Sequence, residues 1–109
     1  MAQQEHQSCI EACDACAAAC DHCATACLSE PNVAAMVECI KSDMDCADIC
    51  RLASAVMARD SSRAQEICSL CASICDACAA ECEKHQHEHC KQCAEACRKC
   101  ADECRGMSR

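Results

Sequence analysis

Nineteen of the 109 residues in this chain carry a thiol, and their spacing follows a helical period. From Cys9 to Cys27, the steps between cysteines alternate between four and three residues. This alternation keeps every thiol on one stripe of an α-helix. The stripe returns three times, and the full set is Cys9, Cys13, Cys16, Cys20, Cys23, Cys27, Cys39, Cys46, Cys50, Cys68, Cys71, Cys75, Cys78, Cys82, Cys90, Cys93, Cys97, Cys100 and Cys104. Because thiolates are ligands for soft metal ions, four such stripes point to metal binding.

Cysteines four residues apart on one helix face have Cβ atoms about 5 to 6 Å apart. Two metal–sulfur bonds of about 2.3 Å, laid end to end, span roughly 4 to 5 Å, so one soft ion fits between such a pair. The chain contains eight non-overlapping pairs: Cys9/Cys13, Cys16/Cys20, Cys23/Cys27, Cys46/Cys50, Cys71/Cys75, Cys78/Cys82, Cys93/Cys97 and Cys100/Cys104. Cys39, Cys68 and Cys90 are left as single thiols in this scheme.

Ligand chemistry narrows the choice of metal. Thiolates select Cu(I), zinc or iron–sulfur clusters. Structural zinc needs four converging ligands, usually from loops, and a straight helix cannot supply four by itself. Iron–sulfur clusters use compact cysteine runs in loops, and the run C-x₂-C-x₂-C-x₃-C-P is absent from the sequence. Cu(I) accepts two or three sulfurs and is therefore the ion that the spacing favours.

Charge balance predicts how many Cu(I) ions the protein can bind. A thiol that takes up Cu(I) exchanges a proton for a monovalent cation, so the net charge of the protein stays unchanged. Two thiolates per ion would leave a negative charge at each of many buried sites, which is costly in a low-dielectric core. We therefore expect a full load of about one Cu(I) ion per cysteine.

Helices must position these thiols. Glycine and proline occur once each and aromatic residues are absent, which favours long uninterrupted helices. Four amphipathic helices with short connections predict an all-α fold, an antiparallel up-down-up-down four-helix bundle with the thiols inside. At this length, residues 1–109 are expected to form a single domain.

The first two helices are separated around Pro31. The first is expected from about Gln3 to Leu28, because the residue before proline disfavours the α conformation. Pro31 is expected in the first turn of the second helix. That helix has the cysteine-poor stripe, which is Met36, Cys39, Asp43, Cys46, Cys50, Ala53 and Met57.

The later boundaries rest on turn and capping signals. A polar turn at residues 59–62 precedes the third helix, and Ser62 with Gln65 matches a capping box. The stripe slips by one residue between Cys82 and Cys90, which we interpret as a tight turn. A continuous helix with a local stutter stays open and would imply a swapped or extended dimer. The fourth helix is expected to end near Gly106.

One end of the bundle gathers weaker copper ligands. In this topology Met36, His85, His87 and His89 share one mouth. Imidazole and thioether suit a relay that receives Cu(I) and passes it inward, so we expect the entrance here, although a solvated turn would also explain the histidines. The opposite end offers a thinner set, which is His6, Met57 and Met107.

Two further polar residues, Asp43 and His22, stand among the cysteines. Asp43 is a carboxylate on the core stripe that could orient a ligand, bind copper weakly, or lie at a widened boundary of the core. His22 lies off the stripe and receives no role.

The net charge of −8 repels nucleic acid and anionic lipid, so neither is an expected partner. The first twenty residues lack a basic and apolar secretion signal, and no window approaches a membrane span. We therefore expect a cytoplasmic protein in a reducing compartment, where thiols persist and bind metal.

The repeated CxxxC spacing on every predicted helix resembles that of the cytosolic copper storage proteins of bacteria, over nearly the whole chain. The resemblance implies a homotetramer of four-helix bundles that stores many Cu(I) ions through thiolates. It leaves the copper donor or acceptor unknown. A zinc-buffering or structural metal-binding module is the alternative. A thiol-redox protein is less favoured, because its usual CxxC site beside a βαβ unit is missing, and we expect no enzyme activity.

Overall fold

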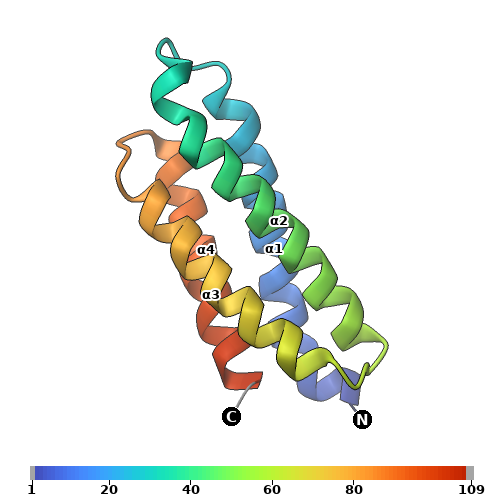
Figure 1. Ribbon diagram of the computed structural model, residues 1–109. Helices are drawn as coiled ribbons and strands as arrows, with labels where there is room; N and C mark the ends of the chain where they lie inside the picture. Colours follow the sequence, from blue (N-terminus) through green and yellow to red (C-terminus); the bar gives the residue numbers. More distant parts are fainter. Residues whose placement is uncertain (1, 108–109) are drawn as a thin grey trace.

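The computed structural model describes residues 2–107 of the chain, and the side chains from residue 6 onward. Its elements are α1 (Ala2–Cys27), the 3₁₀ helix η1 (Val33–Met36), α2 (Val37–Ala58), α3 (Ala64–Cys82) and α4 (Glu88–Met107). The four long helices lie side by side in an elongated bundle of 48 × 19 × 18 Å (Figure 1). The start of α1 and the end of α4 lie at the same end of the bundle.

Each long helix packs against two others, which fixes the topology. Helix α1 contacts α2 and α4, and α3 contacts the same two helices. Because consecutive helices are neighbours joined by short connections, they run antiparallel. The prediction of an all-α, up-down-up-down four-helix bundle is confirmed.

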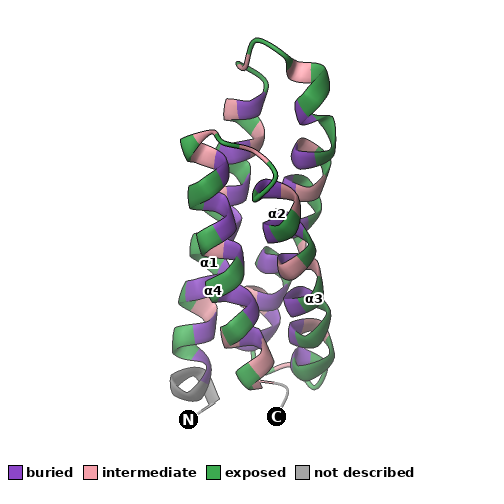
Figure 2. Cartoon of the chain, turned by 90° about the vertical axis from the view of Figure 1, so that its left-hand side faces the viewer, coloured by how far each residue is buried: buried purple, intermediate pink, exposed green. Residues whose placement is uncertain are grey.

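The buried residues form one stripe on each helix, facing the interior (Figure 2). On α2 and η1 the predicted stripe is confirmed throughout, since its members from Met36 to Met57 are at most 2% exposed. Alanines flank the cysteines in the core and, being small, allow the helices to approach closely. The buried alanines are Ala12, Ala17, Ala47, Ala53, Ala64, Ala72, Ala79, Ala94 and Ala101.

The connection between α1 and α2 differs from the expectation. Helix α1 ends at Cys27, and the next three residues form a turn in which the Glu30 N–H donates to the Cys27 carbonyl. Pro31 lies between this turn and η1, so its predicted place in the first turn of the second helix is wrong. The 3₁₀ helix intervenes because Asn32 accepts the N–H of Ala35 at 3.1 Å and α2 begins only at Val37.

Of the predictions for the two remaining connections, one is wrong and one is confirmed. The capping box at Ser62 is wrong, because the hydroxyl of Ser61 instead accepts the Arg63 N–H at 3.1 Å. The tight turn between Cys82 and Cys90 is confirmed, since α3 ends at Cys82 and α4 begins at Glu88. A continuous helix across this region is therefore wrong.

Candidate metal centre

The thiols form the core of the bundle. All nineteen cysteines are buried, and each is at most 2% exposed. The core thus consists mainly of weakly polar sulfur and small alanine side chains. A buried thiol is a poor filler compared with leucine, but it can become a metal ligand when it loses its proton.

Sulfur atoms of the same helix are spaced for a bridging ion. Six of the eight predicted pairs have Sγ atoms 3.8 to 4.0 Å apart. Two bonds of about 2.3 Å span slightly more than this, so a bridging ion needs only a small bend or a small rotamer change. The six pairs are Cys16/Cys20, Cys23/Cys27, Cys46/Cys50, Cys71/Cys75, Cys93/Cys97 and Cys100/Cys104.

Contacts between helices are just as short. The Sγ atoms of Cys13 and Cys100 lie 3.5 Å apart, and others of this kind range up to 3.9 Å. Cys39 lies 3.7 Å from Cys82, and Cys90 lies 3.9 Å from Cys23, so the description of Cys39 and Cys90 as single thiols is wrong. The sulfurs form a network across helices rather than separate rungs on each helix.

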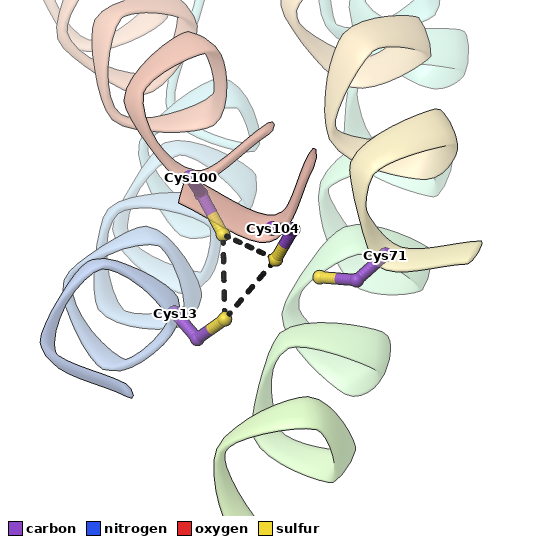
Figure 3. A group of neighbouring side chains, drawn as sticks. All are labelled: Cys13, Cys71, Cys100 and Cys104. Carbon is purple, nitrogen blue, oxygen red and sulfur yellow. Dashed lines mark hydrogen bonds between the residues drawn. The ribbon is translucent and has the colours of Figure 1, made fainter. Parts of the chain in front are cut away.

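Several groups of four sulfurs converge within this network. In one of them, Cys13, Cys71, Cys100 and Cys104 come from α1, α3 and α4, and their sulfurs all lie within 4.8 Å of one another (Figure 3). A zinc ion with bonds of about 2.3 Å needs sulfurs about 3.8 Å apart. Neighbouring helices together therefore supply what one helix cannot, and our geometric argument against zinc is wrong.

The net charge of the metal-loaded core still favours Cu(I) over zinc. Among the side chains that the structure describes, the only buried polar or charged groups are His6 and Asp43, and neither is a lysine or arginine. Four thiolates around one zinc ion would leave two negative charges with no buried cation to balance them, which is costly. Cu(I) ions equal in number to the thiolates leave no net charge.

Two thiols at the mouth, those of Cys27 and Cys90, hold their protons when no metal is bound. Burial raises the pKa of the Cys27 thiol to about 11, and it also raises the pKa of Cys90. These thiols are therefore neutral hydrogen-bonding groups at neutral pH, and each ion that binds must displace protons.

Asp43 belongs to the thiol network. Its side chain is fully buried, and Oδ1 accepts hydrogen bonds from Cys78 and Cys93 at 3.3 Å and from Cys82 at 3.5 Å. Burial, helped by the charge that Cys93 would carry, raises the pKa of Asp43 to about 10. Its other oxygen, Oδ2, accepts from Cys39 at 3.9 Å. The interpretation of Asp43 as a residue at a widened boundary is therefore wrong, and it is a neutral carboxyl group in contact with four thiols.

His89 is the predicted mouth residue that reaches the sulfurs. Its Nδ1 lies 3.4 Å from Sγ of Cys23, 3.5 Å from Cys90 and 4.0 Å from Cys27. The side chain is 12% exposed, so one edge of the ring faces the core while the other lies near the surface. His89 therefore links the outside of the bundle to the last sulfurs of α1 and the first sulfur of α4.

The sequence analysis missed Glu30. Its Oε2 lies 2.8 Å from Nε2 of His89, and its Oε1 lies 3.5 Å from Nδ1 of His87. A signal was present, because Glu30 stands three residues after Cys27, where the next step of the α1 stripe falls. The sequence pattern alone assigns this segment only to the break before Pro31.

The other predicted mouth residues have different surroundings. Nε2 of His85 lies 3.2 Å from Oε2 of Glu81, at the end of α3. Met36 is 2% exposed and begins the buried stripe that continues into α2. His87 is 40% exposed and stacks on His89. His22, which was given no role, is exposed.

The opposite end has a contact of its own. Nδ1 of His6 donates to the carbonyl oxygen of Met57 at 3.3 Å, and both residues are buried. This hydrogen bond joins the start of α1 to the end of α2. Met107, the third residue predicted at this end, is partly buried against the core.

The fold and the site together define a class of protein, a helical bundle whose core is a set of converging ligands for soft metal ions. The chain belongs to the copper storage protein (Csp) family, whose model matches residues 2–109. In the part of the chain that the structure describes, no helix is long and apolar enough to cross a membrane.

The solved structures that resemble this chain include those of two bacterial copper storage proteins. The Cu(I)-bound copper storage protein BsCsp3 is 51% identical, with a TM-score of 0.92 over 95% of this chain and 98% of that chain. A cytosolic copper storage protein from Streptomyces lividans, in a structure described as loaded with five coppers, is 44% identical, with a TM-score of 0.93 over 98% of this chain and 94% of that one.

A curated relative is also similar to this chain. The uncharacterized cysteine-rich protein YhjQ of Bacillus subtilis (strain 168) is 51% identical over 70 residues. The matched segment covers 64% of this chain and 65% of YhjQ, so it spans just under two thirds of that relative.

Proposed function

We propose that this chain stores and sequesters Cu(I) ions as thiolate complexes in the core of its bundle. The observation that carries the proposal is a buried network of cysteine thiols in which neighbouring sulfurs lie 3.5 to 4.0 Å apart. Sulfurs at this spacing can share ions within and between helices. The named copper storage relatives support the choice of metal.

The capacity follows from electroneutrality. Each Cu(I) replaces one thiol proton, so the core accepts about one ion per cysteine before charge accumulates. Asp43 is a neutral neighbour of the sulfurs in this scheme and adds no fixed negative charge to the metal-free core. The nineteen cysteines are the proposed storage ligands.

We propose the mouth with Met36, His85, His87 and His89 as the entrance. His89 supports this choice, because its Nδ1 lies within 4.0 Å of three sulfurs while its side chain still has access to solvent. An imidazole nitrogen binds Cu(I) less tightly than a thiolate does, so an ion received there can move inward.

We further propose that the protein is a single domain and that it is located in the cytoplasm. In this proposal it stores metal and does not catalyse a reaction. We also propose that it assembles as a homotetramer. Exposed apolar side chains on α2 and α3 support an interface there, with Met44 at 56%, Leu52 at 42% and Leu70 at 51% exposure. Apolar patches on a protein surface are typical of contact sites between proteins, and these three side chains are the candidates for one.

The interface can be tested by changing its charge. Replacing Leu52 and Leu70 with glutamate should convert the tetramer to smaller species in multi-angle light scattering, because the charges would be buried without partners. Leu28, which is 60% exposed just beyond the end of α1, provides the control. An unchanged mass for the double variant, or an equal change for Leu28→Glu, would place the interface elsewhere.

An anaerobic titration tests the storage function. The metal-free protein is titrated with Cu(I), and separately with Zn(II), against a competing chelator. Storage predicts uptake of about one Cu(I) per cysteine, and zinc uptake that is weaker because of its uncompensated charge. Saturation at one or two copper ions, or a preference for zinc, would favour the zinc-buffering alternative instead.

A further inference from the structure

The carboxylate of Glu30 contacts two of the three mouth histidines, His87 and His89. Oε2 of Glu30 is 2.8 Å from Nε2 of His89, and Oε1 is 3.5 Å from Nδ1 of His87. The two imidazole rings are stacked, with centroids 5.3 Å apart and an angle of 7° between their planes. Glu30 is 22% exposed and lies in the connection after α1, whereas His89 is in the first turn of α4.

The contact decides which nitrogen of His89 carries the proton. A carboxylate can only accept a hydrogen bond, so Nε2 of His89 is the donor. A neutral imidazole has one N–H group, and the lone pair is therefore on Nδ1. This is the nitrogen that lies within 4.0 Å of the sulfurs of Cys23, Cys27 and Cys90.

We propose that Glu30 is a positioning residue for Cu(I) uptake. It fixes the ring of His89 so that the Nδ1 lone pair faces the sulfurs at the mouth, where an arriving ion can pass from nitrogen to sulfur. The proposal rests on the copper storage function proposed above. Carboxylates that hold a ligand histidine in this way commonly change metal affinity or activity by about 10- to 100-fold when removed.

Two simpler roles compete with this one. Glu30 could only tie the connection after α1 to α4, or its negative charge could only attract cations to the mouth. Three substitutions separate these roles. Glu30→Gln keeps a carbonyl oxygen that can accept from Nε2 but loses the charge. Glu30→Asp keeps the charge but is one methylene too short to reach His89, and Glu30→Ala loses both.

Glu103 offers a matched control. It accepts a hydrogen bond from the hydroxyl of Ser8 at 2.7 Å and so ties α4 to α1 away from His89, near the other end of the bundle. Glu103→Ala therefore removes a carboxylate that also links α4 to the α1 region, but at the end of the bundle away from the mouth histidines. Circular dichroism of each variant measures its helix content.

Two measurements test the proposal. In the metal-free protein, proton NMR should detect a slowly exchanging Nε2–H on His89 in the wild type and in Glu30→Gln, but not in Glu30→Asp or Glu30→Ala. In stopped-flow uptake of Cu(I) from a chelator, Glu30→Ala and Glu30→Asp should be slower by about tenfold or more, while Glu30→Gln recovers most of the rate. Glu103→Ala should match the wild type.

Each result that would contradict the proposal points to a different role for Glu30. Uptake that is slow in Glu30→Gln and normal in Glu30→Asp would replace positioning with simple attraction by charge. Equal slowing in Glu30→Ala and Glu103→Ala, or an unchanged Nε2–H signal in Glu30→Ala, would also overturn the proposal. The NMR result needs no copper, so a low copper capacity of the wild type would refute storage without altering the outcome for Glu30 and His89.

Discussion

Replacing Asp43 with asparagine should change how the stability of the metal-free protein depends on pH. The folded carboxyl is fully buried against four thiols, and burial raises its pKa from 3.8 to about 10. Between these two values, the folded protein holds the proton that the unfolded chain has released. Folding must therefore take up a proton, and it becomes less favourable as the pH rises.

The size of the effect follows from proton linkage. One proton taken up on folding lowers the free energy of unfolding by about 1.4 kcal/mol for each pH unit between the two pKa values. From about pH 5 to about pH 8, the wild type should lose about 4 kcal/mol through Asp43 alone. Above this range the thiols of the unfolded chain also begin to titrate. Asp43→Asn keeps an oxygen that accepts from the thiols and has no proton to lose.

Urea denaturation under anaerobic, reducing and metal-free conditions, followed by circular dichroism, measures this effect. Asp43→Asn should become more stable than the wild type toward alkaline pH, with a difference that grows by about 4 kcal/mol across the range. Asp45→Asn, an exposed position on the same helix, should keep the pH dependence of the wild type. Parallel curves for the wild type and Asp43→Asn would refute the reasoning, because Asp43 would then be ionised in the folded protein.

Two predictions concern copper directly. Replacing His85, His87 and His89 together with alanine should slow Cu(I) uptake. The number of ions bound at saturation should stay almost unchanged, because the thiols hold the stored ions. If that number falls together with the uptake rate, these histidines are storage ligands. Replacing Cys16 and Cys20 with serine should lower the load by about two ions, one for each lost thiolate charge, measured by copper analysis after gel filtration. An unchanged load would contradict the proposed ligands.

The sequence predicted the helical bundle and its buried stripe because both depend on a local period. Steps of three and four residues define a helix face wherever the helix lies, so the inward position of Asp43 and of the cysteines could be read from spacing alone. The end of α3 was predictable for the same reason, since the stripe slips between Cys82 and Cys90.

Contacts between helices could not be predicted in this way. The distance between Cys39 and Cys82 depends on the rotation and axial offset of α2 against α3, which local spacing does not specify. The contact of Glu30 with His89 joins residues separated by 59 positions and depends on how the connection after α1 folds over the start of α4. The position of Pro31 was also missed, because a 3₁₀ helix and an α-helix accept similar residues at their starts.

The central claim is that copper and thiol protons exchange one for one. Native mass spectrometry of the fully loaded protein measures both quantities, since it gives the number of copper ions bound and the number of protons lost. We predict about one ion and one displaced proton for each of the nineteen cysteines. A load near half that number, with about two protons lost per ion, would contradict the claim and show that the core tolerates isolated charged pairs.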